Sequence, residues 1–239
     1  MTRLADLTWP EVADRSTNGA VLLVPLGSTE QHGPHLPLST DTDIAVAIAT
    51  TAADRIPGAV VAPPLPFGSS GEHQGFPGTL SIGAAATESV VLELGRSADD
   101  FASVVLVSTH GGNADPVARA VATLSGEGRA VRAWGPRWDG DAHAGHLETS
   151  LMLVIAPHLV RLETAEAGDL RPVAELLPEL RDRGVAAVSP NGVLGDPAGS
   201  SPQDGRRLLA TAVDQLVTFV VGERPVETVQ WDPMSEEHR

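Results

Sequence analysis

Glu30 and His32, two good metal ligands, follow an apolar run at 20–26 that is typical of a buried strand. In extended backbone, side chains two residues apart point the same way, so Glu30 and His32 can aim at one point. The Pro- and Gly-rich loop 33–40 can then fold back and bring Asp41 to that point. Two carboxylates and an imidazole suit Zn²⁺, Mn²⁺ or Fe²⁺. The alternative interpretation is a surface turn in which Asp41 caps the following helix.

A further candidate ligand, His110, directly follows another apolar run at 102–108. Gly111 and Gly112 come next and allow the backbone to approach a neighbour closely. One alternative is the oxyanion loop of a hydrolase, which requires a G-x-S-x-G nucleophile elbow that this sequence lacks. Another alternative is a structural histidine at the end of a strand. A metal ligand is the interpretation that joins His110 to Glu30 in one site.

The segment 141–150 carries a third cluster of polar residues. A helix is expected to start near Gly145, which places Glu148 in its first turn. Three more polar residues precede Glu148: Asp141, His143 and His146. These groups could complete a two-metal site. The alternative is an ordinary amphipathic helix whose polar residues face solvent.

Ser70, Glu72 and His73 lie in a Gly-rich segment that follows the second strand-like run of the chain. In a parallel sheet, the segments that follow the strands gather at one edge, where ligands bind. We therefore expect these three residues to line the substrate pocket. A plain surface loop is the alternative.

Strand-like and helix-like runs alternate along the chain, which predicts an α/β fold with a parallel sheet and helices on both faces. The expected strands are 20–26, 59–63, 102–108 and 130–134. The expected helices are 42–56, 85–99, 116–124, 147–155, 172–183 and 203–221. The pattern predicts one domain over 1–222. The polar segment 223–239 lacks periodicity and is expected to be a loosely ordered extension.

Composition excludes several classes of protein. The 239 residues include no Cys and no Lys, which removes thiol chemistry, thiolate zinc sites, the P-loop lysine and Schiff-base mechanisms. The net charge of −15 argues against nucleic acid and anionic membranes as partners. The sequence has neither an apolar run of about 20 residues, as a membrane span requires, nor the pattern of a signal peptide, so a cytoplasmic location is expected.

These segments resemble the creatininase family of metal-dependent amidohydrolases. The resemblance extends over nearly the whole chain, and the matching stretches begin at Gly27, Glu72, His110, His143 and Gly192. It implies a three-layer α/β/α sandwich with a mostly parallel sheet, two divalent metal ions per subunit and a homo-oligomer, a hexamer or larger. Within the family, the stretches 141–150 and 174–189 look most like the peptidases of the mycofactocin system.

Carried over, the family pattern implies that Glu30 and His110 hold one metal ion and that His32 and Glu148 hold the other. Asp41 would bridge the two ions. In creatininase itself a metal-binding Glu follows two residues after the histidine that matches His110, whereas this chain has Gly112 there. Glu148 would then supply the missing carboxylate, and creatinine becomes a doubtful substrate.

The mechanism expected from this site is attack of an activated water on an amide carbonyl. His143 is the expected general acid/base, because an ordinary histidine pKa of about 6.5 suits proton transfer. Asp141 could orient His143, and Glu148 is the rival for its role. Arg137 is a candidate clamp for a substrate carboxylate.

The expected substrate is a peptide or a small amide. The subgroup resemblance implies release of a C-terminal Val-Tyr dipeptide from the mycofactocin precursor peptide after its radical-SAM modification. One alternative is an amidohydrolase for a small cyclic amide or for a formamide in pterin or flavin biosynthesis. Another is a metal-binding protein without turnover.

Overall fold

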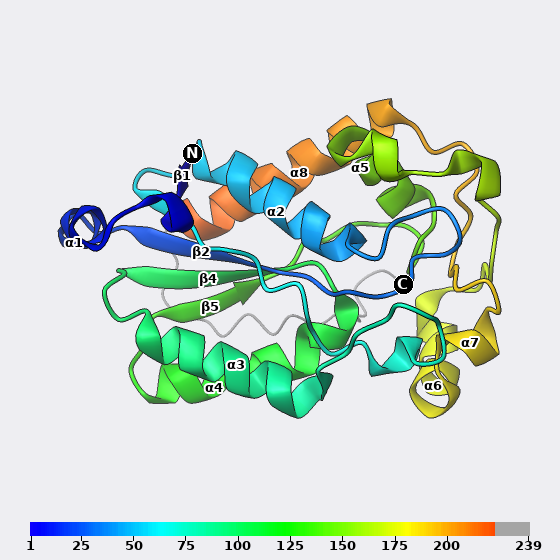
Figure 1. Ribbon diagram of the computed structural model, residues 1–239, viewed down its shortest axis with the longest axis horizontal. Helices are drawn as coiled ribbons and strands as arrows, with labels where there is room; N and C mark the ends of the chain where they lie inside the picture. The colour runs from blue at the N-terminus through cyan, green and yellow to red at the C-terminus, as the bar shows by residue number, and fades with distance from the viewer. Residues whose placement is uncertain (223–239) are drawn as a thin grey trace.

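A parallel sheet of five strands forms the centre of the protein, in the order β1-β3-β2-β4-β5 (Figure 1). The computed structural model describes residues 1–222, so the predicted extension at 223–239 lies outside the described residues. All four strand pairs are parallel. The strands are β1 (Thr2–Arg3), β2 (Val21–Leu26), β3 (Ala59–Val61), β4 (Ser103–Ser108) and β5 (Val131–Trp134).

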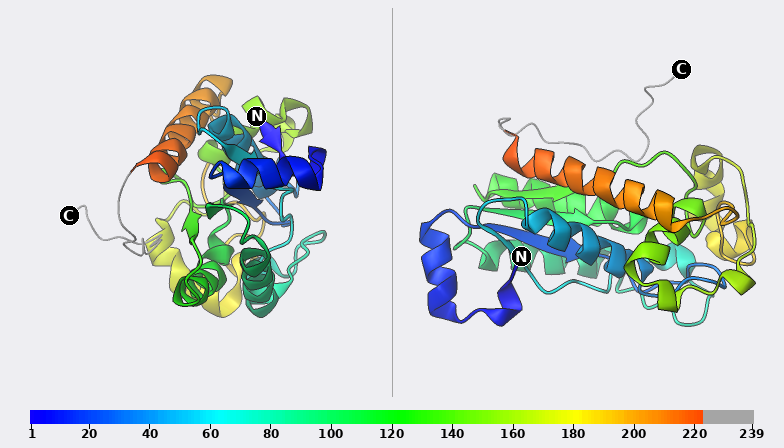
Figure 2. Two further views of the ribbon diagram at one scale, coloured as in Figure 1. Left: turned by 90° about the vertical axis from the view of Figure 1, so that its left-hand side faces the viewer. Right: turned by 90° about the horizontal axis from the view of Figure 1, so that it is seen from above.

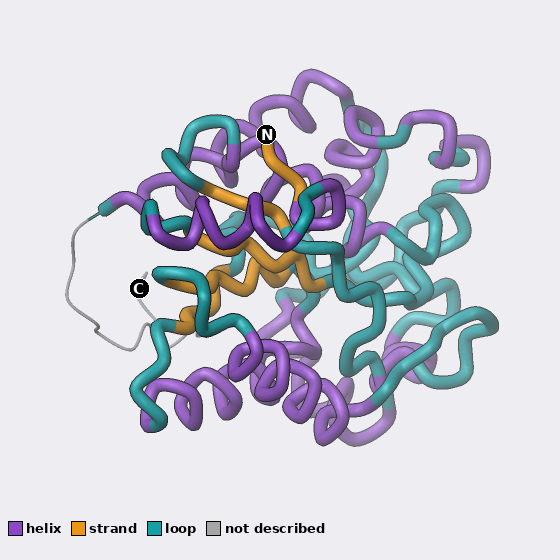
Figure 3. Tube along the Cα trace, turned by 60° about the vertical axis from the view of Figure 1, so that its left-hand side comes forward, coloured by secondary structure: helices purple, strands orange, loops and turns teal. Residues whose placement is uncertain are grey.

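Helices cover both faces of this sheet, so the predicted three-layer α/β/α sandwich is confirmed (Figures 1 and 2). Three helices lie on one face: α2 (Thr40–Ala53), α5 (His146–Ile155) and α8 (Pro202–Val221). Two lie on the other: α3 (Gly83–Ser97) and α4 (Ala114–Gly126). The tube in Figure 3 shows the strands enclosed between these layers. The remaining helices are α1 (Trp9–Thr17), α6 (Val173–Arg183) and α7 (Val185–Val188).

The two faces of the sheet build two hydrophobic cores from alternate residues of the same strands. On β2, Leu23 enters the core under α2, α5 and α8, whereas Leu22 and Val24 enter the core under α3 and α4. Because both faces are buried, the strands are apolar without interruption, and the sequence predicted them from such runs. The four strands and six helices predicted from the sequence are all present, with ends that differ by a few residues.

One strand and two α-helices of the described chain were not predicted. Strand β1 has two residues and α7 has four, too few to show a period. Helix α1 is polar on average and projects from the end of the sheet, and none of its residues is buried, with Trp9 82% exposed. Its start nevertheless carries a local signal, because Thr8 and Glu11 form a capping box.

The register of the two central strands sets the position of the candidate ligands. Leu26 at the end of β2 pairs with Ser108 at the end of β4. The segments that carry Glu30 and His110 therefore leave the sheet side by side at its carboxyl edge, the usual place for a ligand site in this architecture. No helix among residues 1–222 has the length and apolarity needed to cross a membrane.

Candidate metal centre

Five potential ligands meet at the carboxyl edge of the sheet, and four segments supply them. Glu30 and His32 follow β2, Asp41 lies in the first turn of α2, His110 follows β4, and Glu148 lies in the first turn of α5. Helix α2 begins at Thr40 after Ser39, so the alternative of Asp41 as its cap is wrong. The side chains of all five are buried or nearly so, with Glu148 15% exposed.

Glu30, Asp41 and His110 form one group whose donor atoms converge. His110 Nδ1 lies 3.2 Å from Glu30 Oε1 and 3.4 Å from Asp41 Oδ2. One nitrogen of His110 and one oxygen of each of the two carboxylates lie within 4.8 Å of one another. This donor set is suitable for a first-row divalent cation.

A second group contains His32, Asp41 and Glu148. His32 Nε2 lies 3.4 Å from Asp41 Oδ1 and 3.8 Å from Glu148 Oε2. These donor atoms also lie within 4.8 Å of one another. Asp41 therefore presents one oxygen to each group, the geometry that a bridging carboxylate needs.

Backbone carbonyls fix the orientation of both histidines. His32 Nδ1 lies 3.1 Å from the carbonyl oxygen of Glu30, and His110 Nε2 lies 2.9 Å from that of Ser69. A carbonyl oxygen only accepts, so each of these nitrogens carries the proton and donates it. The opposite nitrogens, His32 Nε2 and His110 Nδ1, then present lone pairs to the carboxylates. Metal-binding histidines in proteins are held in this manner.

Unsatisfied polar atoms show that the residues fit a cation. Both carboxylate oxygens of Glu30 and the Nε2 atom of His32 are buried without a hydrogen-bond partner among the described residues. A buried carboxylate without such a partner is costly unless a charge of opposite sign accompanies it. A divalent cation in each group would meet these atoms with the charge that they require.

Without a metal ion, protons would take its place. Burial opposes charge on His32, but Asp41 and Glu148 outweigh burial and raise its pKa to about 10. Burial likewise opposes charge on His110, and Glu30 and Asp41 raise its pKa to about 10. Burial raises the pKa of Glu148 to about 7.

A layer of polar groups surrounds the five residues. Ser28 donates from Oγ to Asp41 Oδ2 at 2.6 Å, and Ser70 Oγ lies 3.3 Å from His110 Nε2. His73 Nε2 lies 3.2 Å from Glu30 Oε1. The structure therefore brings Ser70 and His73, two of the residues predicted to line the pocket, against the cluster.

Glu72, the third of these predicted residues, lies at the margin of the cluster. Its Oε1 atom is 3.7 Å from His110 Nε2, and its side chain is 32% exposed. Burial raises its pKa.

His143 lies beside the cluster as the sequence predicted. Its Nδ1 atom is 3.9 Å from Glu30 Oε1, and its ring centroid is 4.3 Å from that of His32. His143 Nε2 lies 2.9 Å from the carbonyl oxygen of Gln31, so Nε2 carries the proton and Nδ1 is free to accept one. Burial, followed by the charge of His32, lowers the pKa of His143 well below the ordinary value.

The prediction that Asp141 orients His143 was wrong. The Asp141 carboxylate instead accepts the backbone N–H groups of His146 and Leu147, the first two residues of α5. These amides have no carbonyl partner within the helix, and an aspartate is favourable at this end of it. Asp141 therefore stabilises the helix that carries Glu148.

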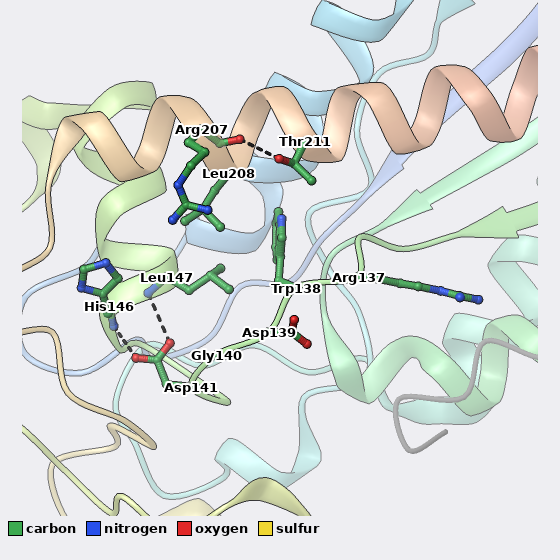
Figure 4. Close-up of a pocket in the computed structure, with 10 residues that line it drawn as sticks. All are labelled: Arg137, Trp138, Asp139, Gly140, Asp141, His146, Leu147, Arg207, Leu208 and Thr211. Carbon is green, nitrogen blue, oxygen red and sulfur yellow. Dashed lines mark hydrogen bonds between the residues drawn. The ribbon is translucent and has the colours of Figure 1, made fainter. Parts of the chain in front are cut away.

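Arg137, the candidate clamp for a substrate carboxylate, lies away from the five potential ligands. It lines a surface pocket of about 290 Å³ between α8, the start of α5 and the loop before it. Figure 4 shows its side chain pointing away from Asp141 and His146. His146 also faces away from the cluster, with Nε2 3.5 Å from Asp204 Oδ2 on α8.

Sequence reasoning missed several residues that support the site. Gln31 lies between two candidate ligands in the sequence, and its side-chain amide contacts His73, His143 and Gly192. Asn113 joins the segments after β2 and β3, since it donates to the Gly27 carbonyl and accepts from the Ser69 N–H. Such roles depend on partners far along the chain, and a short motif does not reveal them.

The family is decided by comparison with known proteins. The family model described as creatinine amidohydrolase, or creatininase, matches residues 5–220. The chain belongs to the creatininase family. As a member of that family it is a hydrolase that acts on amide bonds.

Relatives of this chain include mycofactocin peptidases and a creatinine amidohydrolase. Two proteins named mycofactocin precursor peptide peptidase are the more similar. The one from Mycolicibacterium smegmatis is 51% identical, over 81% of this chain and 81% of its own length, and the one from Mycobacterium ulcerans is 48% identical, over 91% and 87%. The creatinine amidohydrolase of Pseudomonas putida is 29% identical, over 67% of this chain and 74% of its own.

Solved creatininase structures share the fold. A creatinine amidohydrolase aligns with a TM-score of 0.80 at 25% identity, over 92% of this chain and 96% of the other. A structure titled "Creatininase Mn" gives the same TM-score and identity, and a mutant creatininase is described as the Zn-Zn type. Creatininase structures thus include zinc and manganese forms.

Gly112 marks where this chain departs from the creatininase pattern. A Cβ atom at Gly112 would lie 2.1 Å from the Ser69 carbonyl oxygen and 2.6 Å from His110 Nε2. This backbone therefore excludes a glutamate at position 112. The carboxylate beside His32 comes instead from Glu148 in the first turn of α5, with Oε2 3.8 Å from His32 Nε2.

The raised histidine pKa values predict how pH affects the metal-free protein. Each raised pKa adds stability that is complete below the ordinary pKa of 6.5 and is lost as the pH rises towards 10. We expect the melting temperature of chelator-treated protein to fall between pH 7 and pH 10. His32→Asn should reduce this slope, and the exposed His158→Asn should leave it unchanged. Equal slopes in the wild type and His32→Asn would contradict the assignment.

Proposed function

We propose that this protein is a metal-dependent peptidase that acts on the mycofactocin precursor peptide. The observation that carries the proposal is the pair of ligand groups that share Asp41. Its chain is 48–51% identical to proteins named for that peptidase activity. The ligand groups support the chemistry of hydrolysis, and the relatives support the substrate.

In this proposal, Glu30, Asp41 and His110 hold one divalent ion, and His32, Asp41 and Glu148 hold the other. Nitrogen and oxygen ligands of this kind accept Zn²⁺, Fe²⁺ or Mn²⁺. When bound, two such ions supply Lewis-acid activation of water and of the amide carbonyl. The protein holds the ligands in place through Ser28, through the backbone carbonyls behind the histidines and through the Ala144 N–H, which donates to Glu148 Oε2 at 2.7 Å.

His143 is the proposed general acid/base. Its Nε2–H is held by the Gln31 carbonyl, so the proton from the attacking water would be accepted at Nδ1, the atom that faces the cluster. The same atom would then donate that proton to the leaving amine. A ring that is neutral at pH 7 is in the correct state for the first of these steps. Glu148 is the rival, because burial raises its pKa to about 7.

The substrate would approach from the side of the cluster where Glu72 and Glu148 lie. These two carboxylates keep exposed fractions of 32% and 15%, while the other candidate ligands are almost fully buried. We propose that Ser70, Glu72 and His73 contact the peptide there and that the product is the C-terminal Val-Tyr dipeptide. The single domain over 1–222, the homo-oligomer and the cytoplasmic location remain predictions.

Substitution of the shared aspartate tests the metal assignment. Asp41→Asn should lose both metal equivalents, because its two oxygens face the two groups separately. Glu148→Gln should lose only one equivalent. Asp43→Asn is the matched control on the same helix, where its carboxylate accepts from Ser39, and it should retain both. Metal content after reconstitution and desalting is the measurement. Full retention of metal by Asp41→Asn would contradict the bridging role.

Substitution of His143 tests the proton-transfer role. His143→Ala should keep its metal and lose turnover by about 10²-fold or more, as expected for a general acid/base. His146→Ala, in the same loop but directed towards Asp204, is the matched control and should retain turnover. Steady-state rates and metal content of both variants are the measurements. Undiminished turnover in His143→Ala would assign the role to Glu148.

Mass spectrometry of a cleavage reaction tests the proposed function directly. The metal-reconstituted protein is incubated with the modified precursor peptide ending in Val-Tyr. We expect free Val-Tyr, lost on chelation and restored by metal. Absence of cleavage with metal bound would refute the peptidase proposal and favour a small-amide substrate, for which the 29% identical creatinine amidohydrolase is the precedent. Absence of hydrolysis of any amide would favour a metal-binding protein without turnover.

A further inference from the structure

Gln31 lies between the candidate ligands Glu30 and His32, and its side chain is turned away from both groups of ligands. Its amide is buried and contacts three segments of the protein. Oε1 accepts the Gly33 N–H at 2.8 Å, and Nε2 donates to the Gly192 carbonyl at 3.0 Å. A Cβ atom at Gly192 would lie 1.9 Å from Oε1, so only glycine leaves room for the amide.

The two backbone contacts determine which way the amide points. Exchanging its oxygen and nitrogen would place the oxygen against the Gly192 carbonyl and the NH₂ group against the Gly33 N–H. Both contacts would then be repulsive. The Gln31 NH₂ group therefore faces His73, with Nε2 2.9 Å from His73 Nδ1. His143 Nε2 also lies 3.1 Å from this nitrogen, but it gives its proton to the Gln31 carbonyl, so it accepts nothing and the second N–H of the amide is left for His73.

This orientation decides the tautomer of His73. An NH₂ group only donates, so His73 Nδ1 must accept. An imidazolium ring or the Nδ1–H tautomer would set one N–H against another. The single proton of His73 therefore lies on Nε2, the atom 3.2 Å from Glu30 Oε1. Glu30 Oε1 then faces an N–H group on this side instead of a lone pair, at a distance of 3.2 Å and without a directed hydrogen bond.

We propose that Gln31 and His73 are a positioning pair for Glu30: the Gln31 amide fixes the Nε2–H tautomer of His73, and this N–H, 3.2 Å from Glu30 Oε1, favours the carboxylate position in which Glu30 binds its metal ion. The proposal rests on the proposed function for the identity of Glu30 as a ligand. It extends that function by giving roles to two buried residues outside the five ligands. Of the two groups that share Asp41, only the one with His110 contains Glu30, so the pair acts on that ion and leaves the ion of His32 and Glu148 unaffected.

Two variants separate this role from general support of the fold. Gln31→Met has a similar shape and cannot donate to His73. His73→Gln places an amide nitrogen near the former Nε2 position, so it can donate to Glu30 without a tautomer to be selected. Gln74→Met is the matched control, since Gln74 is exposed and adjacent to His73 in sequence.

Metal affinity, measured by competition with a chelating dye, is the first readout. Gln31→Met should weaken one of the two metal equivalents by about 10-fold or more, the usual effect of losing a group that orients a ligand. Gln74→Met should weaken neither. In the His73→Gln background, adding Gln31→Met should have little further effect, since the two residues act in series. Equal weakening of both equivalents, or fully additive effects in the double variant, would overturn the proposal.

The second readout uses the wild-type protein without metal, so it does not depend on the folding of any variant. Solid-state NMR of metal-free, ¹⁵N-histidine-labelled wild type reports which nitrogen of His73 is protonated, assigned through its contact with the Gln31 amide. Protonation at Nε2 supports the positioning pair, and protonation at Nδ1 overturns it. This result does not depend on metal binding or on turnover. Its failure is therefore distinct from failure of the proposed function, which would show as a wild type that binds no metal or that cleaves no peptide.

Discussion

Buried negative charge is the constraint on which the rest of this structure depends. Glu30 and Asp41 lie in the interior at the edge of the sheet, close enough that each raises the other's cost of ionisation. The Glu30 oxygens have no hydrogen-bond partner among the described residues. Positive charge must therefore be present, as protons on His32 and His110 or as metal ions in their place. Loss of protons on metal binding follows directly from this exchange.

The fold brings these charged side chains together with short connecting segments. Two adjacent parallel strands end in register, so the segments after them meet without long connections. Helix α2 returns Asp41 from the opposite direction, and α5 brings Glu148 in its first turn. Around these groups, backbone carbonyls hold the histidine tautomers, and Asp141 stabilises the start of α5. Each ligand thus lies on, or next to, a strand or helix that contributes to the hydrophobic cores.

Periodicity and spacing predicted much of this arrangement. Continuous apolar runs predicted the parallel sheet, and the apolar run before Glu30 and His32 placed both beyond the end of a strand. The geometry of the loop before α5 was not predictable in this way. Ala144 adopts a left-handed φ of 53°. The Asp141 carboxylate accepts from amides five and six residues further along the chain, so its role could be predicted only if the first residue of the helix were known. Gln31 depends on Gly192, which no local pattern connects to it.

The most direct test of this account is anomalous X-ray diffraction from crystals of the manganese- or zinc-loaded protein. The account predicts two anomalous peaks, with Asp41 between them. Oδ1 of Asp41 would bind the ion beside His32, and Oδ2 the ion beside His110. A single peak, or two peaks with Asp41 bound to neither or to only one, would contradict a site in which one buried carboxylate joins two metal ions.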